Sequence, residues 1–218
     1  MPIVSVVGKK GGIGKSTIAI SLAAEAFERG QQVLLVDADP TASARTWSEV
    51  AAERGHTAPS VIAMGATMHQ PGQLQRVAQG YDLVLVDTPP FDDERQRSAI
   101  AVSDVALLPC APSVLEAWAL ASTARLIAEA QSFRERKGLA PLRAFVVVTR
   151  KKPKTAIGKS VRDVLAKTGL PILKTELCDR VTYTEFATSG RGLAGYAPSS
   201  LAAREVQRLS DEIAEMVA

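Results

Sequence analysis

Short apolar runs alternate along this chain with longer segments in which apolar and polar residues recur at helical spacing. The apolar runs predict six strands, at residues 3–7, 32–37, 60–64, 82–87, 105–109 and 144–149. The first, second, fourth and sixth runs are almost uninterrupted in Val, Leu and Ile. Such continuity is typical of strands in a parallel sheet that is covered by helices on both faces.

Helical patterns occupy residues 15–29, 41–54, 92–102, 114–137 and 155–168, and a last one runs from about 199 to 217 with Ser199 or Ser200 as its N-cap. The alternation predicts an α/β fold. Its sheet should be doubly wound and mostly parallel, with right-handed crossovers and helices on both faces. Since no internal repeat, low-complexity segment or long linker interrupts the pattern, we expect a single domain over residues 1–218.

Composition supports a protein that works in the cytoplasm. Hydrophobic residues make up 46% of the chain and aromatic residues only 5%, so the core is expected to be aliphatic. No apolar run approaches the roughly 18 residues of a membrane-spanning helix, and the first apolar run is too short for a signal peptide. The two cysteines, Cys110 and Cys178, fit buried thiols in a reducing compartment better than a disulfide framework.

The first predicted strand leads into the sequence GKKGGIGKST at residues 8–17, and the first predicted helix follows. A glycine-rich loop between a strand and a helix is the setting of a phosphate-binding loop, because its N–H groups and the helix N-terminus attract anions. Lys15 is expected to reach the β- and γ-phosphates, Ser16 to ligate Mg²⁺, and Thr17 to contact the α-phosphate. The nucleotide-binding residues predicted in this loop are Gly11, Gly12, Ile13, Gly14, Lys15, Ser16 and Thr17.

The loop departs from the common pattern G-x-x-x-x-G-K-[ST], because Lys9 stands where its first glycine would be. Residues 9–16 fit x-K-G-G-x-x-K-[ST] instead, the deviant Walker A motif. By this motif the chain resembles the ParA/MinD superfamily of dimerising ATPases. The resemblance implies that Lys10 reaches across a two-fold axis to the nucleotide of the other subunit. There it would stabilise the charge of the transferring phosphoryl group only after dimerisation.

Acidic residues follow two of the predicted strands. VDADP places Asp37 and Asp39 at the end of the second strand, and VLVDTPP places Asp87 at the end of the fourth. Ligands of doubly wound sheets gather at the carboxyl ends of strands. The resemblance implies that Asp39 orients or deprotonates the attacking water, and that Asp37 and Asp87 hold Mg²⁺ through water. The predicted catalytic residues are therefore Lys10, Lys15 and Asp39, the metal site is Ser16, Asp37 and Asp87, and the cofactors are ATP and Mg²⁺.

The adenine pocket is also predicted from the resemblance. In this superfamily the base lies against the loop after a late strand and a second loop near the C-terminus. These segments correspond here to Thr149 and Arg150 and to the surroundings of Arg180. The VTRK sequence at 148–151 is similar to that of the short, ParF-like partition ATPases.

The positive charge of the chain is concentrated in one tract. The net charge is only +3, yet residues 143–167 hold eight basic residues and one acid, which makes +7 there and 3 − 7 = −4 elsewhere. Such a local excess attracts a polyanion, and we expect it to bind double-stranded DNA without sequence preference. The predicted DNA-binding residues are Lys151, Lys152, Lys154, Lys159, Arg162 and Lys167, with Arg204 and Arg208 as an extension one helical turn apart.

The resulting prediction is a cytoplasmic, nucleoid-associated ATPase of the ParA type. It would form a homodimer with ATP and position a plasmid or protein cluster. A ParB-like or cargo-adaptor protein would stimulate its slow hydrolysis. Only seven residues precede the glycine loop, so the longer partition ATPases with a helix-turn-helix match poorly.

Three alternatives share the fold. A MinD-like membrane-cycling regulator is disfavoured because the last nine residues carry three acids and no base. A metabolic or metal-trafficking ATPase would be expected to have a Cys or His cluster. A nitrogenase iron protein would be expected to have its cysteines in glycine-flanked loops, and neither Cys110 nor Cys178 lies in one.

Overall fold

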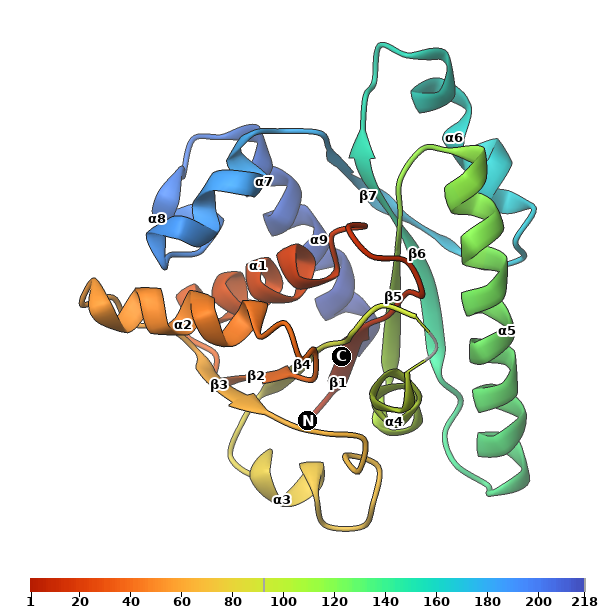
Figure 1. Cartoon of the computed structure of the whole chain (residues 1–218), viewed down its shortest axis with the longest axis horizontal. Helices are drawn as coiled ribbons and strands as arrows, with labels where there is room; N and C mark the ends of the chain where they lie inside the picture. Colours follow the sequence, from red (N-terminus) through yellow and green to blue (C-terminus); the bar gives the residue numbers. More distant parts are fainter. Residues whose placement is uncertain (92, 218) are drawn as a thin grey trace.

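The computed structural model describes residues 1–91 and 93–217, except for the side chains of residues 157–160. Its seven strands form one sheet in the order β3-β2-β4-β1-β5-β6-β7 (Figure 1). All six pairs of neighbouring strands are parallel, which confirms the predicted doubly wound α/β fold. The strands are β1 (Ile3–Val6), β2 (Val33–Asp37), β3 (Ser60–Ala63), β4 (Leu83–Asp87), β5 (Val105–Cys110), β6 (Arg143–Lys151) and β7 (Ile172–Cys178).

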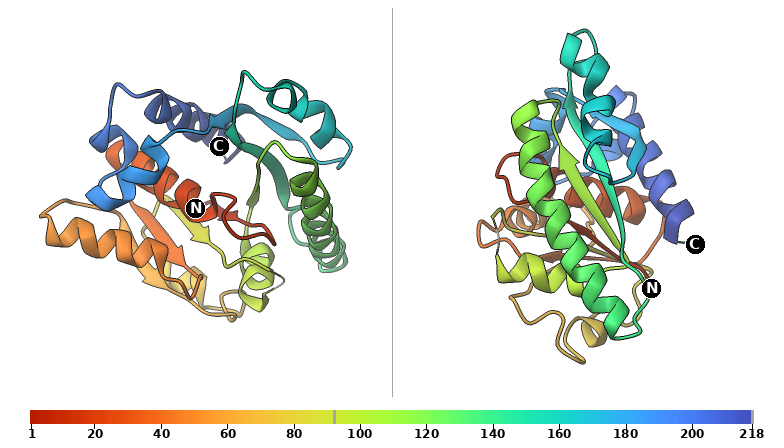
Figure 2. Two further views of the ribbon diagram at one scale, coloured as in Figure 1. Left: turned by 45° about the horizontal axis from the view of Figure 1, so that its top comes forward. Right: turned by 90° about the vertical axis from the view of Figure 1, so that its right-hand side faces the viewer.

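Helices cover both faces of this sheet (Figures 1 and 2). One face carries α1 (Lys15–Glu28), α2 (Ser43–Glu53) and α9 (Leu201–Val217), whose buried residues share one apolar cluster. The other face carries α3 (Leu74–Val77), α4 (Glu94–Val102), α5 (Val114–Arg136) and α6 (Ala156–Ala166), which contribute to two further clusters. Within the described residues, no helix combines the length and apolar character needed to cross a membrane.

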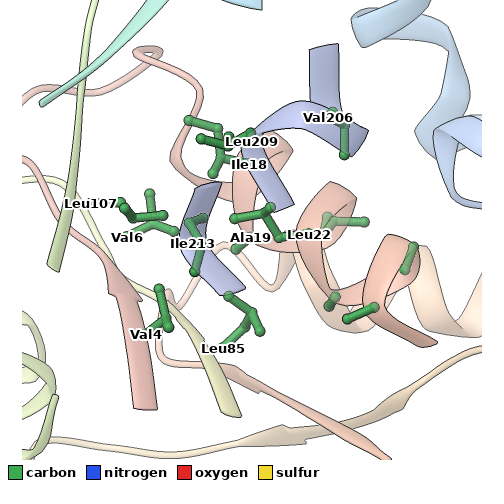
Figure 3. Packing of buried hydrophobic residues seen from close by; sticks show 14 of the residues in the cluster. Val4, Val6, Ile18, Ala19, Leu22, Leu85, Leu107, Val206, Leu209 and Ile213 are labelled. Atoms are coloured by element: carbon green, nitrogen blue, oxygen red, sulfur yellow. The ribbon is translucent and has the colours of Figure 1, made fainter. Parts of the chain in front are cut away.

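The central strand β1 shows why its sequence is continuously apolar. Val4 and Val6 pack under α1 and α9, whereas Ile3 belongs to the cluster on the opposite face. Figure 3 shows Leu22 of α1 and Ile213 of α9 in the same layer above the strands. Side chains alternate between the two faces of a strand, so every position of β1 is buried.

Helix α9 is capped and closely bound to the sheet. The Ser200 hydroxyl accepts a hydrogen bond from Ala203 N–H (3.1 Å), so Ser200 is the N-cap of the two predicted candidates. At the other end, the Glu212 carboxylate accepts the backbone N–H groups of Lys174 (2.7 Å) and Thr175 (2.9 Å). These bonds tie the acidic end of the helix to the edge strand β7.

Several elements differ from the sequence-based prediction. Strand β7 was missed because Lys174 and Glu176 interrupt its apolar pattern, as is common at the edge of a sheet. Strand β6 is longer than the predicted run 144–149. Helix α4 starts at Glu94, with Asp93 as its N-cap, and residue 92 of the predicted range lies outside the described residues. Short helical turns that lacked a periodic signal are α3, α7 (Thr182–Glu185), η1 (Phe186–Ser189) and α8 (Leu193–Tyr196).

Candidate active site

The glycine loop joins β1 to α1 at the carboxyl edge of the sheet. Gly12 and Gly14 have φ angles of 73° and 94°, in the left-handed region where a side chain would be strained. Gly14 is the N-cap of α1 and, having no side chain, leaves the first N–H groups of the helix open to a ligand. A helix N-terminus of this kind favours an anion through its N–H groups and its dipole.

A cavity of about 600 Å³ lies over this loop, within the size range of small-molecule sites. Segments far apart in the chain meet around it: the glycine loop, the loop after β2, Pro90 after β4, the end of β6, and the end of β7 with α7. All strands that contribute do so from their carboxyl ends, as predicted. The sequence-predicted residues that line the cavity are Gly11, Gly12, Gly14, Lys15, Ser16, Thr17, Asp39, Thr149, Arg150 and Arg180.

Lys15 provides a buried positive charge at the floor of the cavity. Its side chain is only 6% exposed, and its ammonium donates a hydrogen bond to the carbonyl of Lys10 (3.0 Å). Burial lowers the pKa of Lys15, and the nearby carboxylates of Asp87 and Asp39 act in the opposite direction. The ammonium is therefore held by the protein where the phosphates of a nucleotide would meet it.

Asp87 is a buried carboxylate without a partner. It is fully buried at the end of β4, and neither of its oxygens has a hydrogen-bond partner in the described part of the chain. Burial raises the pKa of Asp87 to about 7. The Ser16 side chain opposes the rise, and Asp37 and Asp39 add to it. Buried acceptors are normally satisfied, so this carboxylate, with the Ser16 side chain beside it, has the chemistry to bind a cation.

A magnesium ion fits these residues. Mg²⁺ prefers oxygen ligands and usually takes one or two protein groups, with phosphates and water for the rest. The Asp87 carboxylate and the Ser16 hydroxyl lie close enough to influence each other. Across the described residues, no cluster of three or more His, Cys, Asp or Glu side chains forms a ready metal cage. A site that depends on nucleotide phosphates needs no such cage.

The two acids after β2 have different surroundings. Asp39 lines the cavity, and one of its oxygens accepts Thr41 N–H (2.9 Å). Asp37 lies behind it, 2% exposed, and accepts the N–H groups of Asp39 (3.2 Å) and Arg45 (3.0 Å). Asp37 thus shapes the loop that presents Asp39, and its predicted place in the water shell of Mg²⁺ remains a prediction.

Two predicted residues of the glycine loop do not face the cavity. The side chain of Ile13 is buried beside Gly8. Its backbone carbonyl accepts a hydrogen bond from the hydroxyl of Thr149, which lines the cavity (3.2 Å). The ammonium of Lys10 forms an ion pair with Glu116 in the first turn of α5, and Lys10 does not line the cavity. Within one subunit, therefore, Lys10 does not contribute its charge to the cavity.

The predicted adenine side is engaged by protein contacts. Arg150 donates to the carbonyl of Gly12 (3.2 Å) and thereby bridges β6 and the glycine loop. Arg180 is bound by Glu205 of α9 through two nitrogens, at 3.0 and 2.6 Å. The Tyr183 hydroxyl donates to the same carboxylate (3.0 Å). Glu205 was not predicted, and it fixes the position of Arg180 at the cavity wall.

Backbone strain gathers around the same cavity. Ala42, Phe91 and Arg150 are the non-glycine residues with positive φ among those described, at 58°, 69° and 51°. Each is a cavity-lining residue or directly follows one. Conformations of this kind cost about 1–3 kcal/mol and cluster at functional sites. The strained loops support the location of the site independently of the sequence motif.

Gln96 connects two of these loops and was missed from the sequence. It is fully buried, and its amide donates to the carbonyls of Gly8 (3.2 Å) and Pro89 (3.0 Å). The glycine loop and the loop after β4 are thereby joined through one side chain. No sequence signal marked it, because Gln96 stands among charged residues in a strongly polar helix.

The predicted DNA-binding residues whose side chains the structure describes fall into two groups, those with acidic partners and those without. Lys151 forms an ion pair with Glu176, and the Lys152 ammonium lies 3.4 Å from a carboxylate oxygen of Asp179. The Arg162 guanidinium contacts the Glu176 carboxylate (3.3 Å) and donates to the carbonyl of Leu173 (2.9 Å). The side chain of Lys159 lies outside the described residues. Of the predicted residues, Lys154, Lys167, Arg204 and Arg208 are exposed and form no ion pair with the described part of the chain.

Comparison with known proteins agrees with this geometry. Residues 4–193 match the family described as CobQ/CobB/MinD/ParA nucleotide binding domain. The chain is 29% identical over 212 residues to maintenance of carboxysome distribution protein A of Halothiobacillus neapolitanus, covering 96% of this chain and 94% of the relative. It is 31% identical over 239 residues to the chromosome-partitioning ATPase Soj of Thermus thermophilus, with the same two coverages.

A solved structure shows the same fold. The septum site-determining protein MinD of Pyrococcus horikoshii, complexed with Mg-ADP, superposes with a TM-score of 0.76 and 20% identity, covering 100% of this chain and 97% of that protein. The glycine loop, the acids at the strand ends and the family match over most of the chain lead to one assignment. This chain is a member of the ParA/MinD family of nucleotide-binding ATPase domains.

Proposed function

We propose that this chain is a ParA-type ATPase domain, spanning residues 1–218, that dimerises on ATP, binds DNA and positions a cargo. The observation that supports it most is that buried Lys15 and buried Asp87, which share no hydrogen bond or ion pair, both lie at a cavity of nucleotide size. A buried ammonium and a buried carboxylate without a partner suit a triphosphate and its metal ion. Each charge would then meet its opposite.

The proposed chemistry is ATP hydrolysis. Lys15 and the N–H groups of the glycine loop hold the β- and γ-phosphates. Ser16 and Asp87 would hold Mg²⁺, which would supply positive charge to neutralise the phosphate oxygens. Asp39 orients the attacking water from the cavity wall. Lys10 of the second subunit completes the site, so hydrolysis depends on the dimer and is slow until a partner protein stabilises the closed state.

DNA binding is proposed for the exposed basic residues at the β6–α6 side and on α9. Lys154 and Lys167 belong to the first group, and Arg204 and Arg208 to the second. Contacts to phosphates are independent of sequence and weaken steeply with salt. A dimer doubles these contacts, so ATP-driven dimerisation strengthens DNA binding and hydrolysis releases the protein.

The names of two relatives support a proposal for the class of cargo. One relative is named for the distribution of carboxysomes and another for chromosome partitioning. We propose that this chain likewise moves a large body, either DNA or a protein cluster, over the nucleoid in the cytoplasm. A ParB-like or adaptor protein bound to that body would trigger hydrolysis.

A MinD-like cycle on a membrane is the alternative. Membrane binding by α9 would require its apolar face, but Val206, Leu209 and Ile213 of that face lie in the core. Its acidic end is bound to β7. This arrangement favours DNA over an anionic membrane as the surface that the protein binds.

Co-sedimentation separates the two functions. The protein is mixed with double-stranded DNA or with anionic liposomes, each with Mg-ATP, Mg-ADP or no nucleotide. We expect ATP-dependent sedimentation with DNA and none with liposomes. Sedimentation with liposomes and none with DNA would contradict the proposed function and support the MinD-like alternative.

Asp39→Ala tests the catalytic part. The variant should bind ATP as the wild type does, fail to hydrolyse it, and remain dimeric in Mg-ATP. Sedimentation velocity and phosphate release measure the two properties. Hydrolysis at the wild-type rate would exclude the role of Asp39.

A further inference from the structure

The side chain of Lys10 already has a partner within its own subunit. Its ammonium pairs with Glu116, and the two side chains are 45% and 14% exposed. One residue earlier, Lys9 N–H donates to the Thr123 hydroxyl (3.4 Å), about two turns further along α5. Glu116 and Thr123 are seven residues apart and lie on one face of the helix. The start of the glycine loop is therefore seated on α5.

The backbone carbonyl and the side-chain ammonium of Lys10 therefore have partners in different parts of the protein. The Lys10 carbonyl accepts the hydrogen bond from Lys15, so the backbone at residue 10 is tied to the phosphate side. The ammonium lies instead in a small hollow between the loop and α5, lined by Pro109, Glu116 and Leu120. We take a Lys10 side chain that extends to phosphates in another subunit to be one that has left this hollow and its contact with Glu116.

The surroundings of the ion pair are exposed and apolar. Leu115 and Trp118 lie on either side of Glu116 in the sequence and are 64% and 69% exposed. Phe91, 72% exposed, is joined to the same loop because its N–H donates to the Lys9 carbonyl (2.6 Å). Contiguous exposed apolar patches mark surfaces that a partner covers, and we take these three side chains as the rim of one such surface. A second copy that closed over this rim would bring its nucleotide towards Lys10.

We propose that Glu116 is a positioning residue that holds Lys10 in the monomer and releases it when the dimer closes. The proposal rests on the ATP-dependent dimer of the proposed function. Each subunit must give up one Lys10–Glu116 pair before its ammonium can reach the partner's phosphates. The Glu116 carboxylate and the phosphates bound to the partner then compete for the Lys10 ammonium. The carboxylate opposes closure of the dimer without ATP, and the several phosphate charges of ATP overcome it. In effect, the competent position of Lys10 is only partly populated in the monomer.

Glu116→Gln tests this, because it keeps the shape and removes the charge. A partly exposed pair is worth up to about fivefold in an equilibrium constant, and a symmetric dimer releases two pairs. Dimerisation with a non-hydrolysable ATP analogue should therefore tighten by about 3- to 25-fold in sedimentation velocity. Hydrolysis without any partner protein should rise at protein concentrations where the wild type is mostly monomeric. ATP binding by the monomer should not change.

Two controls show whether the effect passes through Lys10. Glu129→Gln removes an equal charge from the exposed side of the same helix and should leave dimerisation unchanged. In a Lys10→Ala background, at protein concentrations high enough for that variant to dimerise with the analogue, Glu116→Gln should have no effect on dimerisation, since there is no ammonium to release. Tighter dimerisation that persists without Lys10, or that Glu129→Gln reproduces, would show general electrostatics and overturn the proposal.

Two further outcomes distinguish failure of the Glu116 proposal from failure of the proposed function. Unchanged or weaker dimerisation of a Glu116→Gln variant with a wild-type melting temperature would exclude the holding role, while the proposed function would stand. If the wild type itself stays monomeric with Mg-ATP and with the analogue, the proposed function fails and the role of Glu116 fails with it.

Discussion

At the scale of single residues, the site places opposite charges inside the protein without pairing them directly. Lys15 is held by a backbone carbonyl, and Asp87 by no hydrogen bond from the described chain. Burying charges without partners costs free energy, which a bound counter-ion recovers. The residue-scale predictions follow from this cost.

Lys15→Gln should remove the charge that the nucleotide phosphates meet. Hydrogen bonds to charged groups contribute about 1.5–3 kcal/mol each, so ATP affinity should fall by at least about tenfold. Isothermal titration calorimetry with Mg-ATP measures it. Lys9→Ala, which leaves the loop backbone intact, serves as the control and should bind normally. ATP binding by Lys15→Gln at wild-type affinity would refute the phosphate-loop assignment.

Asp87 should make the stability of the nucleotide-free protein depend on pH. Its pKa is raised from 3.8 to about 7 by folding, so the folded state favours the protonated acid. The cost is absent well below pH 3.8, grows from there to about pH 7, and reaches about 1–4 kcal/mol at pH 8. The Asp87→Asn variant has no carboxylate to ionise at this position, so its free energy of unfolding should not carry this cost.

Chemical unfolding of both proteins from pH 4 to pH 8, without metal or nucleotide, measures the difference in slope. The free energy of unfolding of the wild type should decline relative to that of Asp87→Asn as pH rises. Adding Mg²⁺ and ATP at pH 8 should stabilise the wild type more than the variant. Parallel pH profiles would show that Asp87 is not destabilised by burial.

The sequence located the residues of this site better than their partners. Lys15, Ser16 and Asp39 meet at one cavity because their positions follow from strand ends, which a one-dimensional pattern can identify. Glu116 pairs with Lys10 across 106 residues, and Glu205 binds Arg180 across 25. Which side chains form such long-range ion pairs depends on how the helices pack on the sheet, and this packing cannot be predicted from local sequence patterns.

At the scale of elements, the same limit separates the central strands from the edge. Strands β1, β2 and β4 were predicted because burial on both faces requires an uninterrupted aliphatic sequence. Edge strand β7 satisfies its backbone groups partly through Glu212 of α9 and can carry polar residues. The basic tract lies beside this edge, and several of its charges are used there to hold the structure.

Charge reversals should therefore distinguish binding residues from structural ones. Lys154→Glu and Lys167→Glu change exposed side chains that have no ion pair with the described chain. They should weaken DNA binding equally for all sequences, while ATP-dependent dimerisation persists. The salt slope should fall by about one for each DNA phosphate that the variant no longer neutralises. Arg162→Glu would also break the bonds to Leu173 and Glu176, and we expect it to destabilise the fold.

Fluorescence anisotropy with two unrelated duplexes over a range of salt measures these effects. Arg204→Glu with Arg208→Glu tests the surface of α9 in the same assay. If only the α9 variant loses binding, the DNA surface lies on α9 and the tract at 143–167 is structural. If all variants bind as the wild type does, DNA binding by either surface is excluded.

At the scale of the whole molecule, Lys10 forms an ion pair with Glu116 of α5 and does not line the cavity, so the proposed catalytic role of Lys10 requires a second subunit. If Lys10 acts on the nucleotide of the other subunit, its loss should spare ATP binding by the monomer. Dimerisation, hydrolysis and DNA binding should then fall together, because all three need the closed interface. If Lys10 acts within its own subunit, ATP hydrolysis should depend only on the chain that binds the nucleotide.

A covalently tethered pair of subunits separates these two arrangements. One subunit carries Lys10→Ala and the other Lys15→Ala, so only the first can bind ATP and only the second supplies Lys10. Action across the interface predicts one working site and recovery of up to about half of the wild-type hydrolysis rate per tethered pair. A pair with both changes in the same subunit is the matched control. Its intact subunit binds ATP but meets no Lys10 from the other, so it should stay inactive. Hydrolysis by this control, with none by the mixed pair, would show that Lys10 acts within its own subunit.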